Sequence, residues 1–170
     1  MDLKQYIRDV PDFPIPGVLF RDITPLLKHP PAFNYVLDEF TRVARDNAIE
    51  GVVAIESRGF IFGAPLARAL NVPFVPIRKP GKLPAARMSI EYSLEYGTNQ
   101  LDIHQDALEH GQRVVIVDDL LATGGTARAA AKLVEMVGGT VVHFLFVIEL
   151  TTLHGRKALE GYDVTALIAY

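Results

Sequence analysis

Apolar runs alternate along this chain with segments that have a helical pattern. Three runs consist mostly of β-branched and other apolar residues, at 52–55, 114–117 and 140–150. Such runs are typical of strands that are buried on both faces of a parallel sheet. Three further segments have apolar residues at helical spacing or many strong helix formers, at 32–47, 61–70 and 127–137. This alternation predicts one α/β domain, residues 1–170, with a mainly parallel sheet flanked by helices.

Other segments have weaker patterns. Residues 1–10 have apolar positions at helical spacing and predict a short amphipathic helix. Three prolines in 11–16 predict a stiff, extended segment without regular structure. Residues 72–79 predict a short or peripheral strand, because its two prolines each remove a ladder hydrogen bond. Residues 152–160 predict a short helix, and 163–170 predict an edge strand.

A polar, partly alternating segment at 89–103 predicts a hairpin. Gly97, Thr98 and Asn99 form the expected turn between its two arms. We expect little apolar surface to anchor this hairpin, which suits a mobile lid over about 82–104 that closes on a substrate. Glu95 and Tyr96 lie within this lid.

The most informative stretch follows the run at 114–117. Asp118 and Asp119 come where this strand is expected to leave the sheet, and a loop of small residues, 122–126, then leads into an alanine-rich helix. The two glycines of the loop let the backbone turn and approach a ligand closely, and the helix adds free N–H groups at its positive end. The loop therefore predicts a site for a phosphate monoester. The two carboxylates repel a phosphate, so we expect them to face neutral hydroxyls or the waters of a metal ion. Together these features describe a ribose 5-phosphate.

Two common phosphate loops do not match this stretch. A Walker loop has a lysine after its second glycine, where this chain has Thr126, and a dinucleotide loop has three glycines in the spacing G-x-G-x-x-G. A plain strand-to-helix turn at Gly124 and Gly125, with the two preceding aspartates as a solvated cap, remains the alternative interpretation. It leaves unexplained why two carboxylates, two threonines and two glycines coincide here.

A second loop lies where the run at 52–55 should end. Open parallel sheets bind ligands beyond the carboxyl ends of their strands. Arg58 and Gly59 stand there at another predicted helix start, which favours a second phosphate-binding loop over a surface arginine. Further on, the densest basic cluster of the chain consists of Arg78, Lys79, Lys82 and Arg87. Such a cluster is commonly a solvated surface, but it also suits a highly anionic ligand.

Composition narrows the function further. The 170 residues are 49% apolar and 22% charged, with a net charge of -3, so we expect no general attraction to nucleic acid or membranes. The absence of cysteine excludes disulfides, thiol catalysis and cysteine-based metal sites. The five histidines are scattered and are interpreted as structural. No secretory signal and no apolar run of roughly 20 residues is present. We therefore expect a cytoplasmic protein.

Residues 114–126 resemble the phosphoribosyl diphosphate (PRPP) motif of the type I phosphoribosyltransferases. This motif by itself indicates only the superfamily. Residues 13–25, 57–60 and 92–97, which include Phe-Arg-Asp-Ile-Thr and Leu-Glu-Tyr-Gly, resemble the members that act on adenine, over essentially the whole chain. The resemblance implies the type I phosphoribosyltransferase fold and the conversion of adenine and PRPP to AMP and pyrophosphate. It also implies Mg²⁺ that arrives with PRPP, and a homodimer.

The resemblance also assigns roles to residues. The ribose 5-phosphate is assigned to Asp118, Asp119, Ala122, Thr123, Gly124, Gly125 and Thr126, with Asp118 facing Mg²⁺ through water and no direct protein ligand to the metal. The pyrophosphate is assigned to the loop residues Ser57, Arg58 and Gly59 and to Lys79 and Lys82 of the basic segment. In this family the loop often contains a non-proline cis peptide. Adenine is assigned to Leu19, Phe20, Arg21 and Leu150, with a hood formed by about residues 1–30. Glu95 and Arg58 are the catalytic candidates, Glu95 as the acid/base at adenine N7, and Tyr96 belongs to the lid.

Two alternative functions remain at this point. One is a phosphoribosyltransferase for another nucleobase, such as a 6-oxopurine or a pyrimidine. The Pro-rich hood and the Leu-Glu-Tyr-Gly lid argue against it. The other is a non-catalytic PRPP sensor, but the chain has no predicted DNA-binding helix pair or basic extension.

Overall fold

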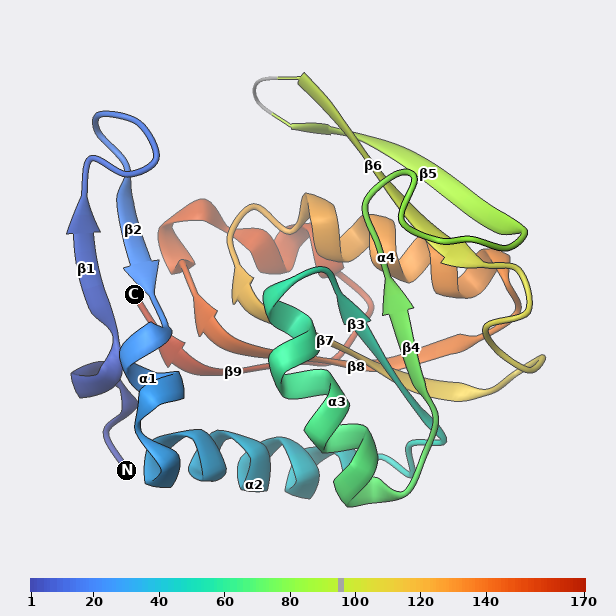
Figure 1. The fold of residues 1–170 in the computed structure, drawn as a ribbon, viewed down its shortest axis with the longest axis horizontal. Coiled ribbons are helices and arrows are strands. Elements are labelled where there is room, and N and C mark those ends of the chain that lie inside the picture. The colour runs from blue at the N-terminus through green and yellow to red at the C-terminus, as the bar shows by residue number, and fades with distance from the viewer. Residues whose placement is uncertain (95–96) are drawn as a thin grey trace. The chain divides into compact units, whose positions relative to one another are not determined.

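The computed structural model describes residues 1–94 and 97–170, and the chain divides into two compact units, Met1–Glu39 and Phe40–Tyr170 (Figure 1). The first unit contains a short 3-10 turn, two strands, one helix and the start of a second helix: the turn Leu3–Tyr6, β1 Arg8–Pro11, β2 Leu19–Asp22, α1 Thr24–Lys28 and α2 Pro30–Asp46. The second unit continues from α2 with the remaining elements: β3 Gly51–Ile55, α3 Arg58–Leu70, β4 Phe74–Ile77, β5 Arg87–Leu94, β6 Gly97–His104, β7 Arg113–Leu121, α4 Gly125–Met136, β8 Thr140–Glu149, the 3-10 turns Thr151–Leu153 and Gly155–Leu159, and β9 Val164–Ala169.

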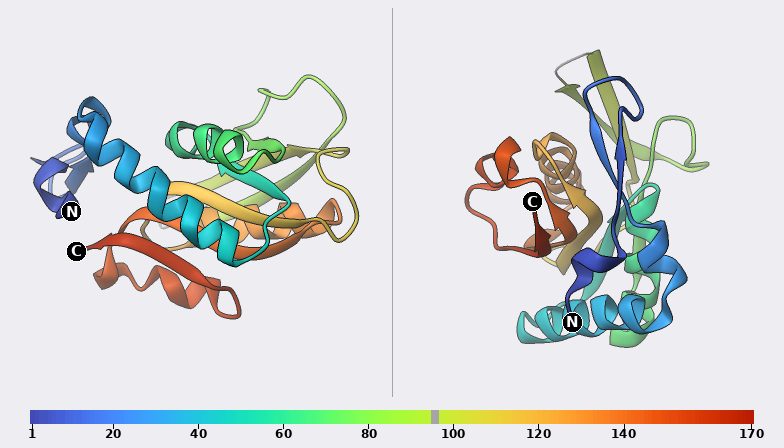
Figure 2. Two further views of the ribbon diagram at one scale, coloured as in Figure 1. Left: turned by 90° about the horizontal axis from the view of Figure 1, so that it is seen from below. Right: turned by 90° about the vertical axis from the view of Figure 1, so that its left-hand side faces the viewer.

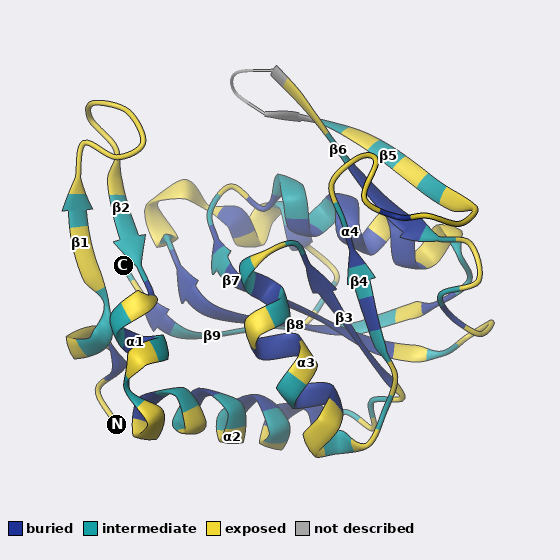
Figure 3. Cartoon of the chain, viewed as in Figure 1, coloured by how far each residue is buried: buried dark blue, intermediate teal, exposed yellow. Residues whose placement is uncertain are grey.

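The second unit is built on a parallel sheet of five strands in the order β4-β3-β7-β8-β9. The three central strands are those with the long apolar runs; β3 is fully buried, and β7 and β8 are mostly buried (Figure 3). The two edge strands are β4, which contains Pro76, and β9. The α/β fold with a parallel sheet is therefore confirmed, as are the peripheral strands predicted at 72–79 and 163–170.

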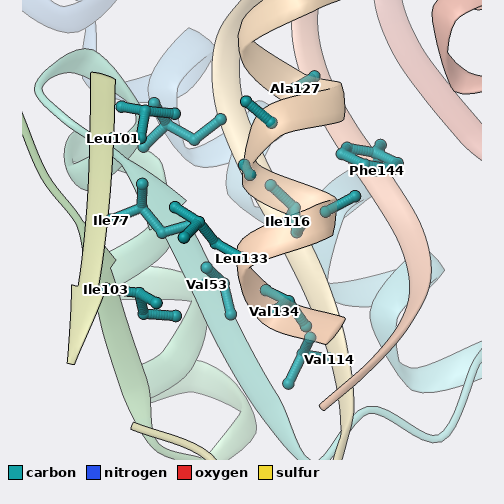
Figure 4. Packing of buried hydrophobic residues seen from close by; sticks show 14 of the residues in the cluster. Val53, Ile77, Leu101, Ile103, Val114, Ile116, Ala127, Leu133, Val134 and Phe144 are labelled. Carbon is teal, nitrogen blue, oxygen red and sulfur yellow. The ribbon is translucent and has the colours of Figure 1, made fainter. Parts of the chain in front are cut away.

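Side chains alternate between the two faces of the sheet, and α3 and α4 pack on opposite faces (Figure 2). Val53 and Ile55 of β3 belong to the apolar cluster that includes α4 (Figure 4). Ala54 points the other way and packs against α3, where a Cβ on Gly63 would lie 2.6 Å from the Cβ of Ala54. Each fully buried Val, Ile or Leu of this kind contributes roughly 1.5–3 kcal/mol to folding. The sheet is thus a rigid platform whose strand ends present the loops described below.

The first unit corrects one prediction and the edge of another. Residues 1–10 form a 3-10 turn followed by strand β1, and the predicted amphipathic helix is wrong. β1 pairs with β2 in an antiparallel hairpin and includes Pro11, whereas residues 12–18 between the two strands have no helix or strand, as predicted for most of the proline-containing segment. Two ion pairs across this hairpin, Arg8 with Asp22 and Arg21 with Asp9, favour the pairing and override the helical pattern.

The hairpin β5–β6 corrects two more. Leu94 pairs with Gly97, so residues 97–99 belong to β6 and are not the turn. The base of the hairpin is also well anchored, because Leu101 and Ile103 are buried in the apolar cluster, contrary to the expected lack of apolar anchoring.

The segment predicted as a helix at 152–160 consists of two 3-10 turns with the left-handed residue His154 between them.

Candidate active site

Two carboxyl groups lie near the carboxyl end of β7, inside the strand and not after it as predicted. Asp118 is opposite Phe146 in the pairing of β7 with β8, and β7 continues to Leu121. The side chain of Asp119 is only 5% exposed. Removal from water raises the pKa of Asp118 well above its usual value, and the charge of Asp119 adds to this effect. Burial also raises the pKa of Asp119, against the opposing effect of Arg58. A strand that places a buried and a half-buried carboxyl group side by side is poorly suited to stability alone.

Arg58 approaches this acidic pair from the start of α3. Its Nε lies 2.9 Å from Oδ2 of Asp119, and its side chain remains 37% exposed. The helix begins at Arg58, three residues before the predicted start at 61, and the preceding Glu56–Ser57 peptide is cis. Gly59 allows the close approach of α3 to β7, because a Cβ there would lie 2.6 Å from the carbonyl oxygen of Val117. The predicted loop at 57–59 and the acidic pair thus meet, although they are distant in sequence.

The loop 122–126 lies directly beyond β7 and opens α4. Gly124 has φ +83° at the N-terminus of the helix, and a Cβ on it would lie 2.4 Å from the carbonyl oxygen of Gly155. A side chain is therefore disfavoured there both by conformation and by space. A cavity of about 200 Å³ is lined by residues of this loop, the acidic pair and Arg58: Arg58, 118–121 and 122–127. Because α4 has twelve residues, its free N-terminal N–H groups provide a strong anion-binding end.

The segment after β4 is held next to this cavity by Glu56. The carboxylate of Glu56 accepts hydrogen bonds from Nε and Nη2 of Arg78 at 3.2 and 3.4 Å and from the backbone N–H of Lys79 at 2.9 Å. The backbone N–H of Lys79 is the main cause of the lowered pKa of Glu56, and Arg78 contributes as well. Lys79 lines a neighbouring cavity of about 270 Å³ together with Glu56, the 57–58 loop and both aspartates.

The other predicted cations lie farther out. Lys82 is exposed, and its carbonyl oxygen accepts a hydrogen bond from Nη1 of Arg78. Arg87 pairs with the buried Asp102 at 3.3 Å and so belongs to the base of the hairpin. Glu56 was not assigned a role from the sequence. Its position at the end of a buried strand was the available signal, but its partners lie more than twenty residues away.

The residues predicted to contact adenine lie in different parts of the chain. Leu150 follows β8 and donates its backbone N–H to the carbonyl oxygen of Leu121 at 2.9 Å, next to the phosphate loop. In the first unit, Leu19 is 46% exposed, and Phe20 packs edge-on against Phe13 at 5.1 Å. Arg21 pairs with Asp9.

The two predicted lid residues, Glu95 and Tyr96, lie outside the described residues. Within the described ranges, no group of three or more His, Asp or Glu side chains is arranged to hold a metal ion. No helix among these residues is long and apolar enough to cross a membrane.

Comparison with known proteins identifies the family. Residues 35–167 match the model of the phosphoribosyl transferase domain. Over its full length the chain is 60% identical to an adenine phosphoribosyltransferase of Acaryochloris marina, of which it covers 100%. The chain belongs to the adenine phosphoribosyltransferase family.

Solved structures of this family have the same fold. The adenine phosphoribosyltransferase of Thermoanaerobacter pseudethanolicus is 56% identical, with a TM-score of 0.96 over 99% of this chain and 98% of that one. The enzyme of Saccharomyces cerevisiae, in complex with an imino-altritol bisphosphate and adenine, is 40% identical, with a TM-score of 0.93 over 98% and 96% of the two chains. The expected type I phosphoribosyltransferase fold is confirmed.

Proposed function

We propose that this protein acts in purine salvage and transfers the 5-phosphoribosyl group of PRPP to adenine, which gives AMP and pyrophosphate. The observation that carries this proposal is the meeting of Arg58, the buried acidic pair and the phosphate loop at one end of a parallel sheet. It is supported by full-length identity of 60% to an adenine phosphoribosyltransferase.

The phosphate loop and the acidic pair hold the ribose 5-phosphate. Ala122, Thr123, Gly124, Gly125 and Thr126 surround the 5-phosphate at the N-terminus of α4, where backbone N–H groups and hydroxyls donate to its oxygens. Asp118 and Asp119 accept hydrogen bonds from the ribose hydroxyls. In their ionised form these carboxyl groups also favour a sugar that develops positive charge at C1.

A cationic wall receives the leaving group. Arg58 and Lys79 line the cavity beside the acidic pair, with Ser57 and Gly59 in the same loop, and Lys82 completes the set from the exposed segment beyond. The bond between C1 and the pyrophosphate oxygen breaks as the bond between C1 and adenine N9 forms. Arg58 stabilises the charge that develops on that oxygen. The acidic side chains of Asp118 and Asp119 suit a divalent cation. Mg²⁺ carried by PRPP would therefore be held through water by Asp118 and would neutralise the leaving pyrophosphate.

Adenine is recognised by backbone polarity and by packing. The backbone groups of Leu19 and Arg21 pair with the amino group at C6 and with the unprotonated N1, while Phe20 and Leu150 cover the faces of the ring. A 6-oxopurine reverses both hydrogen-bonding demands, and the unpaired polar groups that result give strong discrimination. Glu95 accepts the proton from N7 as adenine attacks, and Tyr96 lies beside it in the lid. The enzyme works as a cytoplasmic homodimer, with adenine, PRPP, AMP and pyrophosphate as its partners and no nucleic acid or membrane.

The test is AMP formation from adenine and PRPP with Mg²⁺, with hypoxanthine and guanine as competing bases. Wild type is compared with Glu95→Gln and with Glu160→Gln, a control at an exposed glutamate in another segment. We expect turnover with adenine only, a fall in kcat of about 10²–10⁴-fold for Glu95→Gln, and no change for Glu160→Gln. Turnover with a 6-oxopurine instead would identify another nucleobase enzyme. PRPP binding without turnover of any base would indicate a sensor and overturn the proposal.

A further inference from the structure

One hydrogen bond joins the hairpin β5–β6 to the phosphate loop. The hydroxyl of Tyr92, on β5, lies 3.1 Å from Oγ1 of Thr126, the second residue of α4. β5 lies along α4 (Figure 1), and Tyr92 and Thr126 also line one cavity of about 490 Å³. The contact therefore connects the segment that carries Glu95, three residues after Tyr92, with the proposed 5-phosphate site.

Packing fixes the position of the Tyr92 hydroxyl. Met88, Ile90 and Tyr92 alternate along β5 and all pack against the apolar cluster that contains the buried alanines of α4. Across the hairpin, Leu101 is buried in the same cluster. A tyrosine ring held in this way has little rotational freedom to lose, so its hydroxyl is presented to Thr126 at low entropic cost.

The hydrogen-bonding capacity of two hydroxyls then sets a direction. Each hydroxyl has one hydrogen to donate and can also accept. A phosphate monoester accepts only, so it needs the hydrogen of Thr126. When the Tyr92 hydroxyl donates to Oγ1, the threonine hydrogen is left free to point at the phosphate. If Thr126 donates to Tyr92, that hydrogen is no longer available.

We propose that Tyr92 is a positioning residue that orients the hydroxyl of Thr126 as a donor to the 5-phosphate of the substrate. By thermodynamic linkage, a bound phosphate also strengthens the attachment of the hairpin to α4. The inference rests on the proposed function, because it takes loop 122–126 as the 5-phosphate site. It adds a residue outside that loop and makes phosphate binding and hairpin position interdependent.

Binding of ribose 5-phosphate, measured by calorimetry and by ³¹P NMR, tests the inference. The variants are Tyr92→Phe, Thr126→Val, Thr126→Ser and the double variant Tyr92→Phe/Thr126→Val. Tyr162→Phe is the matched control, because the Tyr162 hydroxyl also bonds to α4, at Glu135 far from the loop. We expect Tyr92→Phe to weaken binding about fivefold to tenfold and Tyr162→Phe to leave it unchanged. Thr126→Ser keeps the hydroxyl and should keep near wild-type affinity.

The double variant separates positioning from general structural support. If Tyr92 acts through Thr126, the double variant binds no more weakly than Thr126→Val alone. In steady-state assays, Tyr92→Phe should raise KM for PRPP and leave KM for adenine unchanged. Additive losses in the double variant, or wild-type affinity in Tyr92→Phe while wild type turns over adenine, would overturn the inference and leave the proposed function intact. Wild type that neither binds ribose 5-phosphate nor forms AMP would overturn both.

Discussion

Replacing Glu56 by glutamine tests how the pyrophosphate side of the site is held together. The Glu56 carboxylate accepts hydrogen bonds from the backbone N–H of Lys79 and from the guanidinium of Arg78, and its side chain is 14% exposed. Glutamine keeps the shape and one acceptor oxygen. It removes the charge and replaces one oxygen by an amide NH2 group. The remaining oxygen, in the place of Oε2, can still accept from Nε of Arg78 and from the N–H of Lys79, but the bond from Nη2 of Arg78 to Oε1 is lost.

The size of the effect follows from these contacts. A hydrogen bond to a charged group is worth about 1.5–3 kcal/mol, but the Arg78 contacts at 3.2 and 3.4 Å are long, and Arg78 is partly solvated. The expected loss in the free energy of unfolding for Glu56→Gln is therefore about 1 kcal/mol, or about 2–4 °C in Tm for a chain of this size. The folded state holds the pKa of Glu56 below its ordinary value of 4.5. The carboxylate thus contributes its full stabilisation above pH 4.5 and loses it as pH falls through the lower, folded-state pKa.

Urea unfolding and steady-state kinetics measure the two consequences. Glu56→Gln should be less stable than wild type at pH 7, and the difference should shrink as the pH is lowered below 4.5. KM for PRPP should rise because a neutral acceptor holds the Lys79 backbone less strongly than the carboxylate does. Glu50→Gln is the control, since Glu50 also accepts a backbone N–H, from Arg113 at 2.9 Å, away from the site cavities. It should leave KM unchanged. A stability difference that is the same at pH 7 and pH 4, or an equal rise in KM for Glu50→Gln, would refute this reasoning.

Three further outcomes are expected. Burial raises the pKa of Asp118, so its ionised form costs stability as pH rises above 3.8. Asp118→Asn should therefore be about 1 kcal/mol more stable than wild type at pH 7 in metal-free urea unfolding, and it should lose activity. A loss of stability would contradict this. At Gly124 an alanine would have a left-handed φ and would clash with the carbonyl oxygen of Gly155, so Gly124→Ala should lower the free energy of unfolding by about 2–4 kcal/mol and weaken phosphate binding. Gly161 has φ +94° but open space around it, so Gly161→Ala should lower the free energy of unfolding by only about 1–2 kcal/mol in the same assays. Desolvation lowers the pKa of His143, so wild type should lose stability as pH falls below 6.5, and thermal melts of His143→Gln should show a weaker dependence between pH 7 and 5.

The fold was predictable wherever one physical signal dominated. Apolar runs rich in β-branched residues are typical of strands buried on both faces, and β3, β7 and β8 lie at the predicted places. The turn from β7 into α4 at 122–126 was predictable because its parts are consecutive in sequence. The prediction was wrong at the acidic pair, which lies inside β7. Carboxyl groups interrupt the hydrophobic pattern that marks a buried strand, so the pattern predicted that the strand ends before Asp118.

Contacts between distant segments were not predictable. Arg58 and Asp119 meet only because two parallel strands, β3 and β7, are neighbours and end at the same edge of the sheet. The cross-strand ion pairs that favour β1 as a strand depend on β2, which begins only after the proline-containing loop that follows β1. In the same way, the turn signal of Gly97 gave way to the register of the hairpin, where Gly97 pairs with Leu94. Local propensity lost in each case to pairing over a longer range.

The anchored base of the hairpin restricts how a lid could close. Leu101 and Ile103 are buried in the core cluster, and the backbone of Asp102 exchanges two hydrogen bonds with Arg78, next to the cationic segment. Moving this base would expose apolar surface and break the backbone bonds between Asp102 and Arg78. A lid motion of the hairpin must therefore leave this base in place or break the bond between Tyr92 and Thr126. Because a 5-phosphate bound as proposed would strengthen that bond, PRPP should hold the base of the hairpin on α4.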